Sequence, residues 1–292
     1  MKGLVIMNAY PAGEKFYRQS ERLAAALNAL GVEAKTVKNG EFSVTLTADG
    51  RVTTNGERID FAVYFDKDKY LGRALEQSGV RLFNRMDGIE LCDDKALTTL
   101  ALLGKGVQVV ETIPAPLCYT VGATPSEAFL KRVQTLGFPL VAKKSYGSFG
   151  AGVRLVKDET ELMETEKEWL YTPHLYQRFL SESAGKDIRV IVVGGKAIAA
   201  IRRIAKEGEF RSNIELGGSG EAIKLTEEYR VAAERCAQVL GLDYCGVDLL
   251  ETADGAAVCE VNSNAFFEGL EAATGIDVAM AYAKHIVSEM TK

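Results

Sequence analysis

The order of the expected elements changes near residue 94, and this change limits the fold more than any other feature. Before it, an apolar run at 3–7 is followed by helical spacing over 14–30 that Gly31 ends. Alternation of this kind predicts an α/β layer. After helices at 94–103 and 125–136, strands follow strands directly, which predicts antiparallel sheets; we expect them at 139–144, 153–156, 174–180, 187–194 and 197–204.

We therefore predict an α/β domain over residues 1–93, followed by an α+β fold with antiparallel sheets. The second part divides into a central region, 94–175, and a carboxyl-terminal region, 176–292. Within the first domain, a polar hairpin is expected at 41–58. The carboxyl-terminal region is expected to hold a helix at 226–240, a strand pair within 246–262 and a last helix near 276–290.

The overall charge argues against nucleic acid and membrane partners. The formal net charge is −5, so no general attraction to phosphate backbones or anionic lipid is expected. No apolar stretch reaches membrane-spanning length, and the first residues lack the pattern of a signal peptide. The cysteines are odd in number and form no C-x-x-C pair, which predicts free thiols in a reducing compartment. We therefore expect cytoplasmic residence. The cysteines are Cys92, Cys118, Cys236, Cys245 and Cys259.

The stretch GVDLLETADGAAVCEVNSN, residues 246–264, predicts a hairpin that turns at Asp254-Gly255. Its apolar strands contain Asp248, Glu260 and Asn262, and a charge inside such a strand is costly unless something pairs with it. Glu260 and Asn262 share one face because they are two residues apart. A half-exposed hairpin with solvated charges is the simpler alternative.

The loop length decides whether Asp248 joins these two. A two-residue loop, Asp254-Gly255, would turn Asp248 to the other face, whereas a three-residue loop that begins at Ala253 would pair it with Glu260. We predict the three-residue loop. Three oxygen donors without His or Cys favour Mg²⁺ or Mn²⁺ beside nucleotide phosphates.

A glycine-rich loop joins two expected strands in PLVAKKSYGSFGAGVRLV, residues 139–156. Glycines such as Gly147 and Gly150 let backbone amides approach a phosphate, but a glycine hairpin alone is more often just a turn. Lys143 strengthens the phosphate hypothesis, since a cation in an apolar strand needs an anionic partner. Lys144 is expected to face the other way, toward solvent.

Charged residues recur inside the expected strands of 177–218. Asp187 and Arg189 share a face and could form a buried ion pair. Arginine also suits a phosphate or acyl phosphate, because its planar fork gives two hydrogen bonds. Neither histidine, His174 or His285, belongs to a metal-ligand or catalytic pattern.

In order along the chain, several blocks resemble those of RimK-type ATP-grasp ligases: NRMDGIELCDDK (84–95), PLVAKKSYGSFGAGV (139–153), QRFLSESAGKDIRVIVVGGK (177–196), RRIAKEGEFRSNIELGG (202–218) and the hairpin 246–264. The resemblance covers about residues 80–280. It implies a pre-ATP-grasp domain over 1–93, then a central subdomain with a glycine-rich lid and a carboxyl-terminal subdomain with the metal site.

The resemblance also implies roles for matching positions. Lys95 and Lys143 would contact ATP phosphates, Arg178 and Phe179 would offer backbone groups to adenine, and Asp187 would lie near the ribose. Arg211, Ser212 and Asn213 match a nucleotide-contacting block. Asp248, Glu260 and Asn262 match the metal ligands, and Arg203 matches a basic residue near the acyl phosphate. Arg189 is a second catalytic candidate because of its place inside an apolar strand, and not because of the resemblance.

One departure concerns the segment after Asn262. Many relatives read N-S-S-P there, whereas this chain continues Ser263-Asn264-Ala265. The N-x-N pattern resembles ligases of the LysX type, which act on a carrier protein. Metal binding is unaffected, but the substrate is left open.

The implied activity is an ATP- and Mg²⁺-dependent ligation of a carboxylate to an amine, often glutamate or another amino acid, through an acyl phosphate. A carrier or target protein and a homo-oligomer are further expectations. Two alternatives stay open: a nucleotide-binding regulatory module that does not catalyse, and an ATP-grasp kinase.

Overall fold

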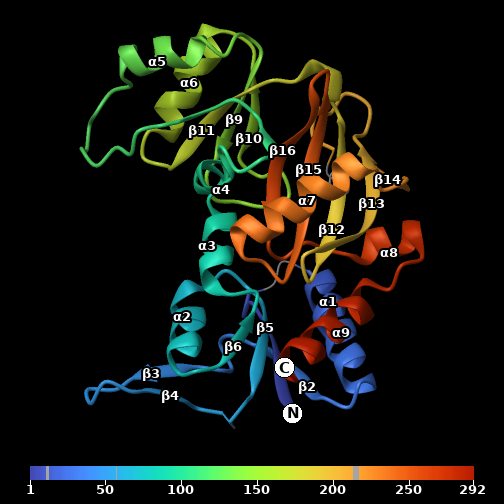
Figure 1. Cartoon of the computed structure of the whole chain (residues 1–292). Coiled ribbons are helices and arrows are strands. Elements are labelled where there is room, and N and C mark those ends of the chain that lie inside the picture. Colours follow the sequence, from blue (N-terminus) through green and yellow to red (C-terminus); the bar gives the residue numbers. More distant parts are fainter. Residues whose placement is uncertain (11–12, 57, 213–216) are drawn as a thin grey trace.

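A computed structural model describes residues 1–10, 13–56, 58–212 and 217–292. Its first layer is the predicted α/β arrangement: a parallel sheet in the order β2-β1-β5-β6. These strands are Lys2–Met7 (β1), Glu33–Lys38 (β2), Phe61–Phe65 (β5) and Arg81–Phe83 (β6), with helices Glu14–Ala29 (α1), Lys69–Gln77 (α2) and Met86–Asp93 (α3). The polar hairpin expected at 41–58 is confirmed by Val44–Leu46 (β3) and Val52–Thr54 (β4), which extend away from the sheet (Figure 1).

The central region has its own small sheet, in the order β10-β9-β11-β8, whose neighbours all pair antiparallel. Helix Lys95–Leu102 (α4) leads into it from the first layer. The other elements are Gln108–Val109 (β7), Thr112–Pro114 (β8), Glu127–Gln134 (α5), Leu140–Lys144 (β9), Val153–Val156 (β10), Glu159–Trp169 (α6) and His174–Arg178 (β11).

The third layer is a six-stranded sheet in the order β14-β13-β12-β15-β16-β7. It is antiparallel, as predicted, except where the short β7 runs parallel to β16. A short 3₁₀ turn, Ser181–Ser183 (η1), precedes it; its further elements are Lys186–Val193 (β12), Lys196–Ile204 (β13), Ser219–Ala222 (β14), Glu227–Leu240 (α7), Tyr244–Thr252 (β15), Gly255–Asn262 (β16), Glu268–Thr274 (α8) and Val278–Met290 (α9).

Helix α6 was missing from the sequence prediction. Its sequence, ETELMETEKEW, carries few apolar residues, so the helical period is weak. The start signal was nevertheless present, because the Asp158 side chain accepts a hydrogen bond from Glu161 N at 2.9 Å and caps the helix.

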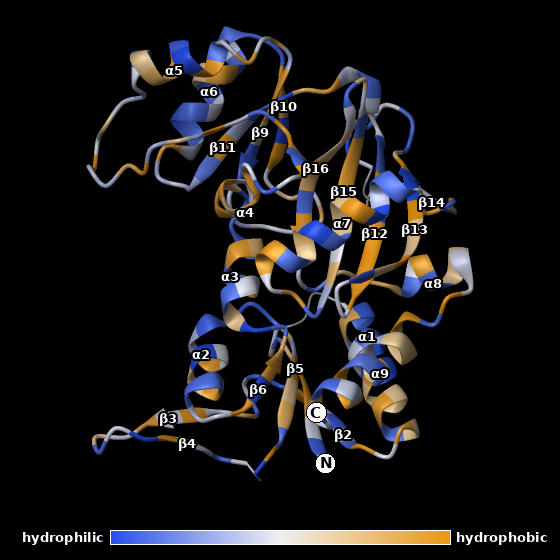
Figure 2. Cartoon of the chain, in the orientation of Figure 1, coloured by the Kyte–Doolittle hydropathy of each residue, from blue (hydrophilic) through white to orange (hydrophobic). Residues whose placement is uncertain are grey.

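The hydrophobic cores connect the first and last parts of the chain. One cluster combines α1 and β5 residues such as Leu23 and Phe61 with Tyr244 from β15 and Tyr282 from α9. Helix α9 therefore packs beside α1 (Figure 1), and β5 and β12 are hydrophobic along most of their length (Figure 2). In the described part of the chain, every helix is too short or too polar to cross a bilayer.

Candidate active site

A cavity that opens to solvent lies between the central sheet and the six-stranded sheet, with a volume of about 870 Å³ including its open part. Strand β9, the glycine loop after it and the β11–η1 segment line one side, and β12, β13, β15 and β16 line the other. Most of the predicted site residues line this cavity: Lys95, Lys143, Gly147, Gly150, Arg178, Phe179, Asp187, Arg203, Arg211, Ser212, Asp248 and Glu260. Asn213 lies outside the described residues.

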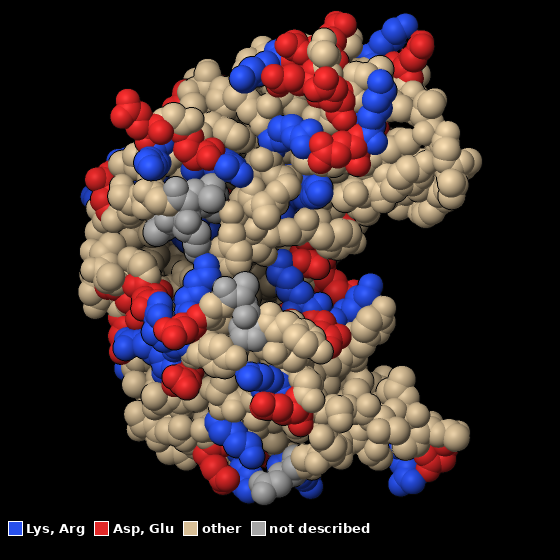
Figure 3. Space-filling view, turned by 180° about the vertical axis from the view of Figure 1, so that it is seen from behind, with Lys and Arg blue, Asp and Glu red and all other residues tan. Residues whose placement is uncertain are grey.

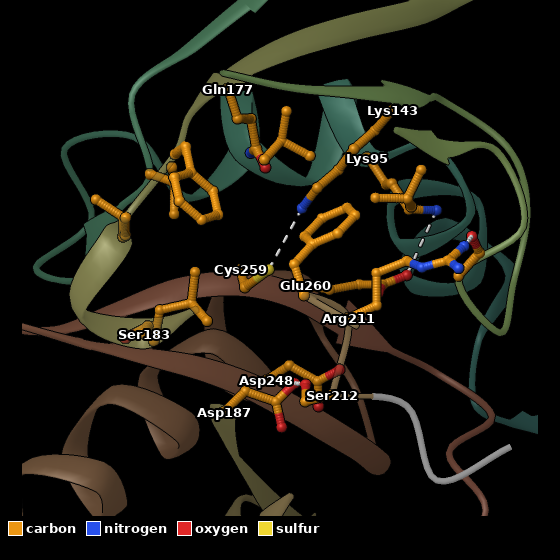
Figure 4. Close-up of a pocket in the computed structure, with 18 of the residues that line it drawn as sticks. Lys95, Lys143, Gln177, Ser183, Asp187, Arg211, Ser212, Asp248, Cys259 and Glu260 are labelled. Atoms are coloured by element: carbon orange, nitrogen blue, oxygen red, sulfur yellow. Dashed lines mark hydrogen bonds and ion pairs between the residues drawn. The ribbon is translucent and has the colours of Figure 1, made fainter. Parts of the chain in front are cut away.

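Two lysines reach toward the hairpin from the central side of the cavity (Figure 4). Lys95 Nζ donates to Gly147 O at 2.9 Å and lies 3.4 Å from Glu260 Oε1. Lys143 Nζ lies 3.3 Å from the Sγ of Cys259. Burial raises the pKa of the Cys259 thiol, which keeps it neutral. The charge of Lys143 is therefore available for an anion, as the phosphate hypothesis requires. Lys144 instead lies over the Trp169 ring, 5.4 Å from its centroid.

The β15–β16 hairpin pairs Asp248 with Glu260, as predicted, but it does so by a different route. The predicted three-residue loop is wrong: Thr252 pairs with Gly255, which leaves a two-residue loop, and Gly255 has a positive φ of 118°. The register then shifts by one residue at a bulge, where Leu249 pairs with Val258 and Cys259 is the extra residue. Both Cys259 and Glu260 consequently line the cavity.

Beneath the cavity lies a cluster of buried charges. Arg189 donates to both oxygens of Asp248 at 2.7 Å, and Arg203 Nη2 lies 2.8 Å from Asp248 Oδ2. Arg203 also forms a bidentate ion pair with Asp187, which accepts a further bond from Ser212. The pair expected between Asp187 and Arg189 does not form, because directly opposite residues on neighbouring strands lie closer than residues two apart on one strand.

Opposing influences set the protonation of the two acids. Burial raises the pKa of Asp187, although Arg203 works against this. Burial also opposes the charge of Asp248, but Arg189 and Arg203 outweigh it and hold the pKa of Asp248 below its usual value. The cluster contains two cations and two anions, so each buried charge has oppositely charged partners that offset its desolvation cost.

The oxygen donors of the hairpin suit a hard divalent cation. Asp248 and Glu260 contribute carboxylates. Asn262 Nδ2 donates to Asp248 Oδ2 at 3.5 Å, which places the Asn262 amide beside them, and its Oδ1 is the third oxygen donor. The described residues contain no group of three or more His, Cys, Asp or Glu side chains placed to hold a metal, so the amide is needed to complete the set. Glu260 is the more exposed of the two carboxylates, since its side chain is 28% exposed and that of Asp248 only 5%. An all-oxygen set favours Mg²⁺ or Mn²⁺.

Sequence reasoning missed a second cavity beside Glu260, with a volume of about 1130 Å³ including the part that opens to solvent. It shares Ser148, Phe149, Arg203 and Glu260 with the first cavity, and it also contains Arg189 and Asn262. Its far wall is formed by Asn8, Asp66 and Lys67, which follow β1 and β5. Ligands often bind outside the carboxyl ends of parallel strands, so this position was a usable signal. Seen from behind, the outline of the molecule is deeply indented between the central region and the first domain (Figure 3).

The glycine loop between β9 and β10 is fixed at its tip by Phe149. This residue has a φ of 59° and is the only non-glycine residue with a positive φ among those described. Its ring centroid lies 6.1 Å from that of Phe16 on α1 and 5.8 Å from that of Phe266, and Lys15 Nζ lies 3.8 Å from it. Arg211 Nη1 donates to Gly150 O at 3.0 Å. The loop is thus tied to both neighbouring layers.

The two residues expected to offer backbone groups to adenine also line the cavity. The Arg178 side chain pairs with Glu111, and Arg178 N donates to Glu111 O at 3.0 Å, so this N–H is not free for a base. Phe179 packs edge to face with Phe210, with ring centroids 6.5 Å apart.

Comparison with known proteins identifies the class. The model of the RimK-like ATP-grasp domain matches residues 92–286, and the chain belongs to this family. It is 37% identical to human N-acetylaspartylglutamate synthase A over 78% of this chain and 57% of that protein. It is 38% identical to a probable alpha-L-glutamate ligase of Thioalkalivibrio sulfidiphilus, over 71% of this chain and 67% of that protein. The predicted family is therefore confirmed.

Solved structures share the fold. A RimK domain ATP-grasp protein of Sphaerobacter thermophilus superposes with a TM-score of 0.74 at 21% identity, covering 98% of this chain and 99% of that one. The D-alanine–D-alanine ligase of Bacillus anthracis, solved with ATP, gives a TM-score of 0.72 at 20% identity over 100% and 97% of the two chains. The predicted fold class is thereby confirmed. The chain spans 55 to 59% of the length of the vertebrate synthases that it matches.

Proposed function

We propose that this protein is an ATP-dependent ligase that joins a carboxylate to an amine through an acyl phosphate. The observation that carries the proposal is that two cavities meet at Arg203 and Glu260. One has the lysines and glycine loop suited to a triphosphate, and the other is large enough for amino-acid substrates. A γ-phosphate at the junction would face a carboxylate held in the second cavity.

The nucleotide would occupy the first cavity with its phosphates between Lys95 and Lys143, beneath the loop that contains Gly147 and Gly150. Arg211 would hold this loop closed through Gly150 O, and Ser212 continues the same wall. Asn213, which lies outside the described residues, is proposed as a further nucleotide contact. Arg178 and Phe179 would lie beside the base. Asp187 acts from below by holding Arg203 in place.

A divalent cation, Mg²⁺ or Mn²⁺, would be held by Asp248, Glu260 and Asn262 and would supply charge neutralisation at the phosphates. The substrate carboxylate attacks the γ-phosphorus, ADP leaves, and an acyl phosphate results. The neutral amine then attacks the acyl carbon, the C–O bond to phosphate breaks, and the amide forms as the nitrogen gives up one proton to the departing inorganic phosphate or to solvent. Arg203 and Arg189 stabilise the negative charge of this intermediate, and the closed loop keeps water away from it.

The relatives suggest the substrate class. The names of the synthases and ligases above contain glutamate, so we propose glutamate or another amino acid as the amine, with a small-molecule, peptide or carrier-protein carboxylate. We also propose the domain division 1–93, 94–175 and 176–292, with α9 returning to the first domain. Cytoplasmic residence is supported by the five cysteines, which are all free.

ADP release tests the function. We expect ADP only when Mg²⁺, a carboxylate and an amine are all present in a panel of amino acids and small peptides. Glu260→Gln should lower kcat by about 100-fold or more, because it removes one negative ligand of the cation. Glu251→Gln, on the same hairpin but bonded to Tyr229, is the matched control and should stay near wild type.

Each other outcome has a meaning. ADP formation without an amine, with a stable phosphorylated product, would indicate a kinase. Nucleotide binding without turnover on any pair would indicate a regulatory module. Normal turnover by Glu260→Gln would show that the metal ligands are assigned wrongly.

A further inference from the structure

Three parallel strands of the first domain end beside the second cavity, and each is followed by a polar side chain. Asn8 comes directly after β1, Asn39 directly after β2, and Asp66 directly after β5. Asn8 and Asp66 line the cavity. The mechanism proposed above uses none of these three residues.

The carboxylate of Asp66 is held by neutral donors only. Asn39 Nδ2 donates to Oδ2 at 2.6 Å, Asn8 Nδ2 donates to Oδ1 at 3.2 Å, and Lys67 N donates to Oδ1 at 2.7 Å. The side chain cannot rotate away without breaking these bonds. Asp66 therefore presents a fixed anionic group at the cavity wall.

No cation of the described residues is paired with Asp66. The neighbouring ammonium, that of Lys67, is engaged with Asp93 Oδ1 at 2.6 Å. Asp68 adds a second negative charge nearby, where it caps α2 through Tyr70 N. Asp66 is only 7% exposed, so its charge is poorly solvated.

A buried carboxylate with hydrogen bonds but no counter-ion is an electrostatically incomplete arrangement. Burial raises the pKa of Asp66, and the charge of Asp68 adds to this effect. An ammonium group in the cavity would supply the missing charge and favour the ionised acid. Amines and amino acids carry such a group at neutral pH.

We propose that Asp66 recognises the ammonium group of an amino-acid substrate in the second cavity. This inference rests on the proposed function. The ammonium group belongs either to the amine acceptor before it is deprotonated or to an amino-acid carboxylate donor, as its α-ammonium group. Asp66 is thus a specificity-determining residue that selects substrates with a free amino group.

Steady-state kinetics test the assignment. Asp66→Asn removes the charge but keeps the shape, so KM for the ammonium-bearing substrate should rise at least about tenfold, while KM for ATP stays unchanged. The substrate whose KM rises identifies the acceptor or the donor. Asp87→Asn is the matched control: it removes the charge of a 72% exposed carboxylate of the same domain, which pairs with Arg73 and does not line the cavity, so every KM should stay near wild type. An unchanged KM for every substrate of Asp66→Asn would overturn the proposal.

Binding to the wild-type protein gives a second test that needs neither the variant nor turnover. Thermal shifts are measured with Mg²⁺, a non-hydrolysable ATP analogue, and a panel of amino acids and their N-acetyl derivatives. We expect at least one free amino acid to raise Tm and its N-acetyl derivative to have no effect. Equal shifts with both forms, or no shift with any amino acid, would refute the role of Asp66. The proposed ligase activity would still stand if ADP release required other substrates.

Discussion

Asp187 is a residue whose surroundings change its expected role. The family resemblance placed it near the ribose, but it is only 7% exposed and its oxygens are bonded to Arg203 and Ser212. A side chain held in this way positions Arg203 from beneath the cavity. Its main contribution should therefore be to the stability and order of the buried charge cluster.

Replacing Asp187 by Asn should consequently affect stability more than nucleotide affinity. The change leaves Arg203 with one carboxylate instead of two, and breaking a buried ion pair costs about 3 kcal/mol or more of unfolding free energy. Urea unfolding measures this loss, and KM for ATP should change less than about threefold. Glu227→Gln, which breaks an exposed pair with Arg230, should leave the unfolding free energy near the wild-type value, because surface ion pairs contribute little. A large rise in KM at unchanged stability would restore the ribose contact.

At the scale of elements, the glycine loop depends on the ring of Phe149. Its contacts with Phe16 and Phe266 join the loop to the first domain and to the segment after the hairpin. Aromatic pairs contribute about 0.5–1.5 kcal/mol each, so their loss should open the loop on the order of tenfold more often.

Phe149→Ala should therefore release ADP without forming an equivalent amount of amide, because water reaches the acyl phosphate. The ratio of ADP to amide measures this uncoupling, and limited proteolysis within 147–152 should be faster than in the wild type. Tyr146→Ala, which removes an exposed aromatic residue outside the cluster, is the control. Tight coupling in Phe149→Ala would show that the ring does not hold the loop closed.

Most of the element order was predictable because most strand and helix signals are local, with α6 as an exception because its helical period is weak. Strand β9, the glycine loop and the Asp248–Glu260 pairing follow from patterns within a few residues of sequence. The bulge at Cys259 was not predictable, since a two-residue loop plus one bulge gives the same pairing as a three-residue loop without a bulge. Asp66 was overlooked because its significance depends on hydrogen bonds from Asn8 and Asn39, which follow other strands and are far from it in sequence.

At the scale of the whole molecule, the first domain is joined to the six-stranded sheet through buried polar contacts. Asn84 is 1% exposed; its Nδ2 donates to Tyr244 O at 2.7 Å and to Ser263 O at 2.9 Å, and its Oδ1 accepts from Tyr244 N at 2.9 Å. Arg81 and His285 meet at Asp243 in the same region. These contacts fix the wall that bears Asp66 relative to the wall that bears Glu260.

Asn84→Ala should weaken this junction by about 3 kcal/mol, since it leaves two carbonyls and one N–H buried without partners. The core around Trp169, the single tryptophan, is a separate cluster in the central region. We therefore expect the urea midpoint from far-ultraviolet circular dichroism to fall while the midpoint from Trp169 fluorescence changes little. Asn55→Ala, in the exposed β3–β4 hairpin, removes similar bonds to Ser43 N and Glu41 O and should leave both midpoints near wild type. If both probes shifted together in Asn84→Ala, the central region would unfold as one unit with the rest.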